Sequence, residues 1–240
     1  MLVSRLLYYL ASIPRLLHGF RNWPTAFALF LGLPTRRPVE LVLRQTGLVL
    51  RVRTALEAWL VKEVCIERQY EAASAPIRDG WTVIDIGGGI GEFALDVAKR
   101  FPRTVVWAYE PAGEAFQLLE QNIAANNLSN VRALRDAVGA PAAGTTLAAV
   151  TLDEILRVNG IARCDYLKID CEGCEYATLL SASDDALRRI SVICLEYHDR
   201  LTGRSHLELQ GRLERNGFRV SIQPSPVHRG QGLLSAARIV

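Results

Sequence analysis

Short apolar runs alternate with amphipathic stretches along the chain from residue 81 onward. The apolar runs have the length of buried strands, and the stretches between them repeat apolar residues at helical spacing. Such alternation predicts an α/β fold with a doubly wound, mostly parallel seven-stranded sheet that helices cover on both faces. Too few residues separate the last two strands for a helix, so the final strand is expected to turn back antiparallel. The predicted strands are 81–86, 104–109, 131–134, 165–169, 191–197, 218–222 and 233–240, and the predicted helices are 91–101, 113–126, 152–158, 174–180 and 207–216.

The first 75 residues have a different pattern, and we assign them to an N-terminal helical extension that precedes a sheet domain at 76–240. Helices are predicted at 2–17, with an apolar face and scattered arginines, and at 54–70. The longest stretch without charge, 22–35, is 14 residues long and contains two prolines. It is shorter than the ~20 apolar residues that cross a bilayer, and no cleavage site of the secretory type is evident.

Charge is distributed unevenly between these two parts. The chain has 50% hydrophobic and 22% charged residues and a net charge of +3, which is typical of a globular protein. Residues 1–50 hold six arginines and one acidic residue, Glu40, so their net charge is +5 and that of 51–240 is −2. No nucleic acid partner is therefore expected for the sheet domain. The basic, apolar residues 1–35 are expected either to contact a membrane surface peripherally or to pack on the domain or on a second copy of the chain.

Five cysteines, an odd number, occur in a chain without an evident export signal. Reduced thiols in the cytoplasm, with or without contact to the inner face of the membrane, are the simplest interpretation. Cys171 and Cys174 form a C-x-x-C motif, which is typical of zinc and redox sites. No second C-x-x-C or H-x-x-x-H supplies the remaining zinc ligands, so we interpret the spacing as coincidental.

A glycine-rich turn follows the first predicted strand. Asp85 precedes Gly87, Gly89 and Gly91, and a helix is predicted directly afterwards. A strand, a glycine turn and a helix N-terminus place backbone N–H groups against a small polar or anionic ligand. A dinucleotide site requires G-x-G-x-x-G. The spacing G-x-G-x-G after an acidic residue is instead typical of S-adenosylmethionine (SAM) sites, where the carboxylate of Asp85 would face the cationic end of the cofactor.

Two further acidic residues follow the next two strands. Glu110 lies 19 residues beyond Gly91, where a carboxylate accepts both ribose hydroxyls of an adenosine in SAM and NAD sites. Asp136 follows the third strand, where it can accept the adenine amino group. The carboxyl ends of parallel strands meet at one edge of a sheet, so both side chains are expected to bind the cofactor.

The ends of the fourth and fifth strands are expected to face the substrate. Asp170, Glu172 and Glu175 follow the fourth strand, and His198 follows the fifth. Glu175 is explained by the preference of a helix N-terminus for acids, whereas Asp170, Glu172 and His198 are candidates for a catalytic base. Asp170, Glu172 and Glu196 offer the alternative of a divalent cation site, but we predict no metal here.

Four motifs resemble the FkbM-type SAM-dependent methyltransferases: D-I-G-G-G-I-G at 85–91, Y-E-P at 109–111, T-L-D at 151–153 and K-I-D-C-E-G-C-E at 168–175. The family typically has D-I-G-A-N-I-G in the first motif and K-I-D-V-E-G-x-E in the last. Glu63 and Tyr70 match a segment that usually precedes its first strand, so the resemblance covers about 53–220. It implies a class I methyltransferase fold of the Rossmann-like type, with SAM as the cofactor.

The resemblance also implies O-methylation of a hydroxyl on a small-molecule or glycan acceptor, either a sugar or a secondary metabolite. The sequence lacks the Asn/Asp-Pro-Pro-aromatic motif that grips planar amines after the fourth strand, which also favours a hydroxyl acceptor. The loops 140–149 and 200–207 are expected to form the acceptor pocket. Two alternatives remain: a SAM- or nucleotide-binding protein without catalysis, and an NAD-dependent dehydrogenase with an atypical glycine loop.

Overall fold

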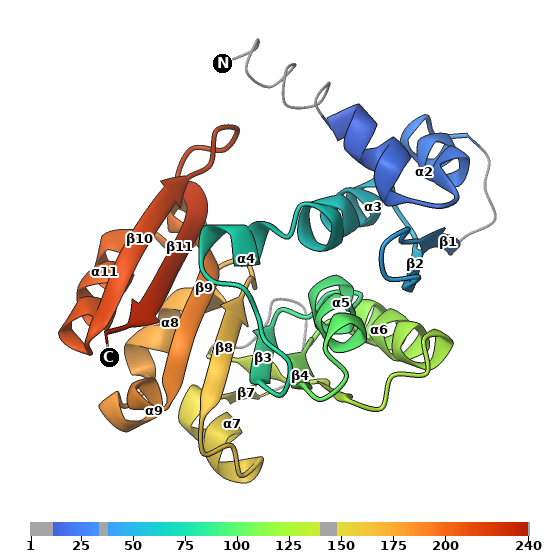
Figure 1. The fold of residues 1–240 in the computed structure, drawn as a ribbon. Coiled ribbons are helices and arrows are strands. Elements are labelled where there is room, and N and C mark those ends of the chain that lie inside the picture. The colour runs from blue at the N-terminus through green and yellow to red at the C-terminus, as the bar shows by residue number, and fades with distance from the viewer. Residues whose placement is uncertain (1–11, 34–37, 140–147, 240) are drawn as a thin grey trace.

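The computed structural model describes residues 12–33, 38–139 and 148–239. Its centre is a seven-stranded sheet with the strand order β10-β11-β9-β8-β3-β4-β5 (Figure 1). All strands run parallel except β11, which is antiparallel to both of its neighbours. The predicted α/β fold and mostly parallel sheet are thereby confirmed. The strands are β3 (Thr82–Ile86), β4 (Val105–Tyr109), β5 (Val131–Leu134), β8 (Cys164–Ile169), β9 (Ile190–His198), β10 (Phe218–Pro224) and β11 (Gln231–Arg238).

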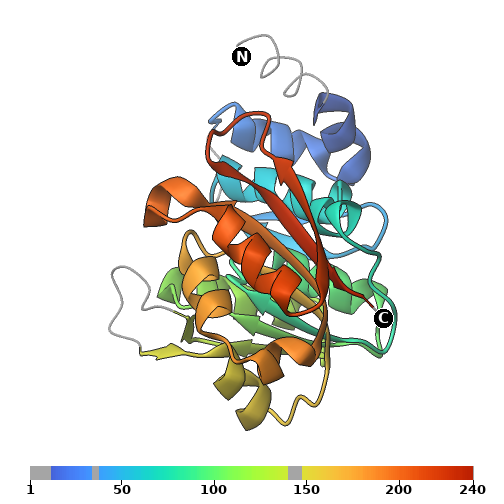
Figure 2. The same cartoon turned by 90° about the vertical axis from the view of Figure 1, so that its left-hand side faces the viewer.

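Helices cover the sheet on both faces because each central strand is apolar on both sides. On β9, Val192 and Cys194 belong to one core, and Ile193 and Leu195 belong to the other. The first core contains α5 (Glu92–Arg100) and α6 (Gly113–Ala125). The second contains α7 (Leu152–Val158), α8 (Cys174–Ser181), α9 (Asp184–Arg188) and α11 (His206–Arg215). Figure 2 shows α8 and α11, in orange, side by side on this second face.

Short elements connect these parts. The strands β6 (Ala137–Val138) and β7 (Ala149–Val150) form a parallel pair outside the main sheet. The helix α10 (Asp199–Thr202) follows β9 directly and overlaps the start of the loop 200–207 that was expected to border the acceptor. Residues 140–147, the greater part of the other expected acceptor loop, lie outside the described residues.

The N-terminal extension contains a β-hairpin in addition to helices. A helical segment at 12–19 and α2 (Trp23–Phe30) precede the antiparallel strands β1 (Val39–Val42) and β2 (Val49–Val52). The helix predicted at 2–17 is described only from residue 12. The single helix predicted at 54–70 is wrong. The segment consists of α3 (Ala55–Val61), a π-helical turn that continues it (Lys62–Ile66) and a separate α4 (Gln69–Ala73). The break before α4 occurs at Arg68, which adopts a left-handed conformation with φ +51°.

Two asparagines, one on α6 and one directly after its last residue, bind the outer edge of the hairpin. The side-chain amide of Asn126 accepts from Val49 N (2.9 Å) and donates to Val49 O (2.6 Å). Asn122 does the same for Arg51 N (2.8 Å) and Arg51 O (3.3 Å). These amides satisfy backbone groups that an edge strand would otherwise leave unpaired.

The extension and the sheet domain share one hydrophobic core. Phe20, Leu41 and Leu50 are fully buried and belong to the same apolar cluster as Leu95 and Leu119 of the sheet domain. Part of the surface of the extension is nevertheless apolar and exposed, at Ile13, Trp23, Leu31 and Leu33. Among the described residues, none of the helices is both long enough and apolar enough to pass through a bilayer.

Candidate active site

The glycine turn between β3 and α5 requires glycine for two physical reasons. Gly87, Gly89 and Gly91 have φ values of +78°, +54° and +95°, in the left-handed region that other residues rarely adopt. A Cβ atom on Gly87 would lie 1.8 Å from the carbonyl oxygen of Asp170. The turn therefore packs directly against the backbone that follows β8, so the carboxyl ends of β3 and β8 adjoin here.

Asp85 lies beneath this turn and is paired with a lysine. Asp85 and Lys168 are register partners on β3 and β8, and Lys168 Nζ lies 2.9 Å from Asp85 Oδ1. The same ammonium donates to the carbonyl oxygen of Gly87 (2.7 Å). Asp85 is 0% exposed, so its charge is balanced within the protein by Lys168, and Lys168 in turn holds the turn through Gly87 O. The sequence interpretation placed Asp85 against a cationic cofactor and did not identify Lys168.

Burial acts on both members of this pair. It raises the pKa of Asp85, and the neighbouring Lys168 ammonium opposes this rise. Burial alone would lower the pKa of Lys168, but the charges of Asp85, Asp170 and Glu92 outweigh it and raise that pKa. Lys168 therefore remains protonated and is the cation that the surrounding carboxylates share.

Glu110 at the end of β4 contacts the glycine turn from the side. Its Oε2 accepts from Gly89 N and its Oε1 accepts from Ala112 N, both at 2.8 Å. Each carboxylate oxygen retains a second lone pair that a ribose hydroxyl can use. Asp136 is half-buried beyond β5, the neighbour of β4 in the sheet. Thus Asp85, the three glycines and Glu110 meet at one site, and Asp136 lies at the next strand end.

Glu92 is a candidate site residue that the sequence interpretation missed. It is the first residue of α5 and is 9% exposed, and its Oε2 has no hydrogen-bond partner among the described residues. A Cβ atom on Gly89 would lie 3.1 Å from that oxygen, so the carboxylate borders the turn. Burial raises the pKa of Glu92 to about 7. A buried carboxylate without a partner suits a ligand that brings an ammonium group. The position of an acid directly after the last glycine could have indicated this role.

A second group of side chains lies at the ends of β8 and β9. One potential ligand atom from each of Asp170, Glu196 and His198 lies within 4.8 Å of the other two. Tyr70 on α4 donates its hydroxyl to Asp170 Oδ2 (2.7 Å). Burial raises the pKa of Glu196 to about 7, with a further contribution from the charge of Asp170. We call Asp170, Glu196 and His198 the strand-end cluster.

His198 is oriented by a buried carboxylate. Glu175 on α8 is 0% exposed, and its Oε1 lies 3.2 Å from His198 Nδ1 and accepts from His198 N (2.9 Å). Its Oε2 accepts from Gly173 N (2.8 Å). Burial would lower the pKa of His198, but the hydrogen bond and charge of Glu175 outweigh it and raise that pKa. Glu175, which we had attributed to helix preference alone, therefore positions a candidate catalytic residue.

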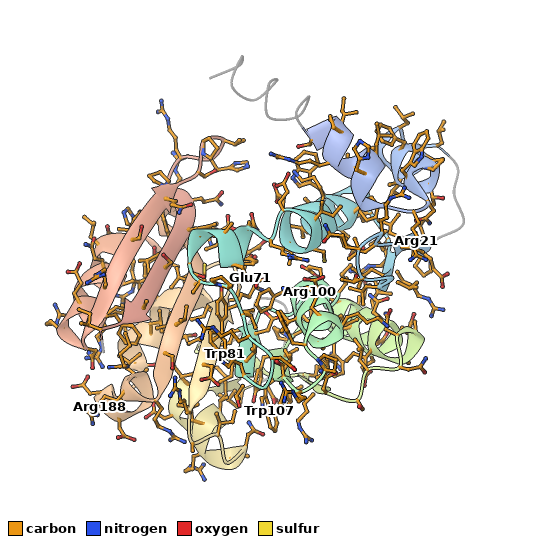
Figure 3. All side chains as sticks on the ribbon, in the orientation of Figure 1. Arg21, Glu71, Trp81, Arg100, Trp107 and Arg188 are labelled. Carbon is orange, nitrogen blue, oxygen red and sulfur yellow. A yellow bond between two sulfur atoms is a disulfide. The ribbon has the colours of Figure 1, made fainter. Side chains whose placement is uncertain are left out.

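Salt bridges and hydrogen bonds hold α4, the helix that carries Tyr70, against the sheet domain. Glu71 on α4 and Arg100 on α5 lie next to each other in Figure 3 and form a salt bridge. Arg100 also donates to Asp96 Oδ2 (2.8 Å), and Glu71 accepts from Ile77 N (3.0 Å). These contacts hold α4 over the strand-end cluster, so the extension contributes to the site.

The loop between β8 and α8 departs from two expectations. Glu172, a predicted candidate base, is exposed, has φ +52° and lies outside the strand-end cluster. Cys171 and Cys174 form a disulfide, so the prediction of reduced thiols is wrong for this pair. The spacing that we interpreted as coincidental places the two Cα atoms 5.5 Å apart across the turn that precedes α8, a separation at which the sulfur atoms can bond. Cys65, Cys164 and Cys194 are free and buried.

Comparison with known proteins identifies the family. A family model described as the methyltransferase FkbM domain matches residues 85–220, which include the glycine turn and the whole strand-end cluster. The chain belongs to the FkbM methyltransferase family.

Curated relatives are similar to parts of the chain. The chain is 33% identical over 78 residues to Methyltransferase 1 of Beauveria bassiana and 32% identical over 78 residues to Methyltransferase sdnD of Sordaria araneosa. Each match covers 32% of this chain and 30% or 29% of the relative. The AMB antimetabolite synthetase AmbE of Pseudomonas aeruginosa is 25% identical over 234 aligned residues, which cover 72% of this chain and 11% of that protein. The chain thus spans less than a third of each of these relatives.

Solved structures share the fold of the FkbM domain. An rRNA methylase from Streptococcus thermophilus superimposes with a TM-score of 0.53 at 14% identity and covers 73% of this chain and 97% of that one. TrmK from M. capricolum, solved with S-adenosylhomocysteine, gives a TM-score of 0.50 at 14% identity and covers 71% of this chain and 67% of that one. These similarities show a class I methyltransferase fold.

Proposed function

We propose that this chain transfers a methyl group from SAM to a hydroxyl group of a small-molecule or glycan acceptor, either a sugar or a secondary metabolite. The observation that carries the proposal is the direct contact between the glycine turn and the strand-end cluster, with Gly87 packed on the backbone of Asp170. Proximity and orientation of two reactants are the main requirements of a methyl transfer. Membership of the FkbM methyltransferase family supports the reaction class.

The residues around the glycine turn fit SAM. The unpaired Oε2 of Glu92 can accept the ammonium of the methionyl part, and Glu110 can accept the ribose hydroxyls. Both carboxylates would repel the pyrophosphate of a dinucleotide, which disfavours the dehydrogenase alternative. The fold shared with TrmK, which was solved with S-adenosylhomocysteine, is consistent with this choice. When bound, SAM supplies an electrophilic methyl group on a positively charged sulfur.

The strand-end cluster provides the groups that act on the acceptor. Tyr70 holds one oxygen of Asp170, which leaves Oδ1 to receive a hydroxyl proton. Glu175 orients His198 so that Nε2 faces Glu196, at 3.9 Å from its Oε1. Asp170 and His198 are therefore the residues that accept the proton and orient the hydroxyl, whereas the exposed Glu172 is the weakest of the three predicted candidates.

The acceptor class rests on the sequence and on one relative. The absence of an amine-binding Pro-Pro motif after β8 favours a hydroxyl. One relative is named as an antimetabolite synthetase, which supports a secondary metabolite over a glycan. Shared fold with an rRNA methylase does not extend to its substrate.

Calorimetry and a transfer assay test the proposal. The purified chain is expected to bind SAM and not NAD, and to transfer label from methyl-labelled SAM to at least one compound in a panel of sugars and hydroxylated metabolites. Asp170→Asn is expected to keep SAM affinity and to lower turnover by about 10²–10⁴-fold, the usual contribution of a general base. Binding of NAD without SAM would refute the proposal, and so would full turnover of Asp170→Asn.

A further inference from the structure

The strand-end cluster combines one imidazole and two carboxylates, a ligand set that proton transfer alone does not require. We propose that Asp170, Glu196 and His198 bind a divalent cation of the first transition row. This inference rests on the proposed function, because the bound ion would hold the acceptor hydroxyl next to the cofactor.

The orientation of His198 is the first observation in favour of a metal. Its side chain is 6% exposed, and Nδ1 is held by the buried Glu175 at 3.2 Å. Metal-binding histidines almost always donate one ring N–H to a carboxylate or carbonyl, which directs the lone pair of the other nitrogen to the ion. Here the other nitrogen, Nε2, faces Glu196 at 3.9 Å and makes no hydrogen bond with any described residue. A lone pair facing a carboxylate is repulsive unless a cation or a proton lies between them.

The charge of the surroundings is the second observation. Asp170 and Glu196 are half-buried, and the charge of Glu63 on the π-helical turn also acts on Glu196. Lys168, whose charge acts on Glu196, pairs with Asp85 and donates to Gly87 O. Tyr70 gives Asp170 a hydrogen bond but no charge. A divalent cation would balance the two carboxylates of the cluster.

The spacing of the cluster suits an ion after a small adjustment. The three ligand atoms lie within 4.8 Å of one another. Ligand atoms bonded at about 2.1 Å to one ion lie about 3 Å apart at right angles and about 4.2 Å apart across it. Side-chain movements of about 1 Å would therefore complete the site. One nitrogen and two oxygen ligands favour Mn²⁺, Fe²⁺ or Zn²⁺ over Mg²⁺ and Ca²⁺, which prefer oxygen alone.

The ion would have a defined part in the reaction. Three protein ligands leave coordination positions for the acceptor hydroxyl, and the ion lowers the pKa of that hydroxyl. With the ion bound, Asp170 and His198 orient the hydroxyl as metal ligands, and the proton that they would otherwise accept passes to water. The oxygen then bonds to the methyl carbon. The bond between that carbon and sulfur breaks, and its electron pair remains on sulfur.

Manganese serves as the probe. The full chain is stripped of metal with EDTA and titrated with Mn²⁺, and free Mn²⁺ is measured by electron paramagnetic resonance. We expect one saturable site per chain, at least about tenfold weaker binding in Glu196→Gln and in His198→Gln, and wild-type affinity in Glu172→Gln. Glu172 is the matched control because it is an exposed carboxylate two residues from Asp170 and lies outside the cluster. Pulsed resonance of the wild-type complex should show nitrogen coupling from an imidazole, a readout that depends on no variant.

Several results would overturn the site. These are the absence of saturable Mn²⁺ binding by the wild type, affinity that is unchanged in both cluster variants, and a complex without nitrogen coupling. Calorimetry with SAM on the same samples separates the two proposals. If the chain binds SAM but no Mn²⁺, only the proposed metal site is refuted. If, in addition, Glu196→Gln and His198→Gln bind SAM more weakly than the wild type, the cluster contacts the cofactor. A chain that binds Mn²⁺ but no SAM refutes the proposed function.

Discussion

Replacing Lys168 with methionine tests the role of the buried ion pair beneath the glycine turn. Methionine keeps most of the side-chain volume but removes the ammonium, so Asp85 remains buried without its partner. Lys168 is 3% exposed and Asp85 is 0% exposed, so little water can reach the remaining charge. Breaking a buried pair by removing one partner typically lowers the free energy of unfolding by about 3–5 kcal/mol. At about 2–4 °C per kcal/mol, the melting temperature should fall by about 6–20 °C.

The loss should depend on pH. Burial already raises the pKa of Asp85, and the variant lacks the lysine that opposes this rise. An acid whose pKa is higher in the folded than in the unfolded state binds more protons when folded, so stability decreases as the pH rises through that interval. The deficit of the variant should therefore be largest at neutral pH. It should shrink as the pH falls toward about 4, the usual value of an unfolded aspartate.

Urea unfolding followed by circular dichroism at pH 5 and pH 7.5 measures both effects. The double variant Asp85→Asn/Lys168→Met is the control, because it removes the uncompensated charge and should regain stability relative to Lys168→Met alone. A single variant within 1 kcal/mol of the wild type at pH 7.5 would contradict the reasoning. So would a double variant that is no more stable than the single one.

Three further predictions concern the glycine turn and the disulfide. Gly87→Ala should weaken SAM binding by more than about tenfold, because the added Cβ would lie 1.8 Å from Asp170 O and the backbone has φ +78°. Gly88→Ala is the control and should bind SAM normally, because its Cβ would lie 3.5 Å from its nearest neighbour. Equal affinities of the two variants in calorimetry would contradict this prediction. SAM affinity should increase as the pH rises through about 7, where Glu92 loses its proton. Glu92→Gln should remove this dependence of affinity on pH. The same pH profile in the wild type and in Glu92→Gln would exclude Glu92 as the ammonium acceptor. Cys171→Ser should lower the free energy of unfolding in urea by about 2 kcal/mol, the entropy of closing so short a loop, and dithiothreitol should lower that of the wild type equally. A wild type that is insensitive to dithiothreitol would show that Cys171 and Cys174 are not bonded in solution.

Local sequence patterns predicted the elements whose boundaries depend on near neighbours. Strand β5 (Val131–Leu134) and helix α7 (Leu152–Val158) begin and end where predicted. Helix α7 starts sharply because Thr151 and Glu154 form a capping box, an interaction between residues three apart. The hairpin at β1 and β2 was missed because each strand has four residues and its outer edge is satisfied by asparagines more than 70 residues away.

In the site, too, the residues set by local sequence were predicted, and those set by contacts distant in sequence were missed. The glycines, Glu110, Asp170 and His198 follow strands, so the rule that parallel strands present ligands at their carboxyl ends located them. Lys168 was missed because its partner, Asp85, is adjacent only through the register of β3 and β8, which the sequence does not reveal. Glu175 was missed as a positioning residue because the preference of a helix N-terminus for acidic residues already accounted for it. Its contact with His198 joins residues that are 23 positions apart in the sequence.

The contact between α6 and the hairpin determines how the protein can be shortened or recombined. The earlier division at residue 75 suggests that the extension could be removed or exchanged with that of a relative. Cutting there would leave the amides of Asn122 and Asn126 without Val49 and Arg51, and a buried polar group without a partner costs about 1–3 kcal/mol. It would also remove Tyr70, and with it the hydroxyl that holds Asp170. A chimera should therefore exchange the hairpin together with α6, and any minimal catalytic fragment must begin before β1.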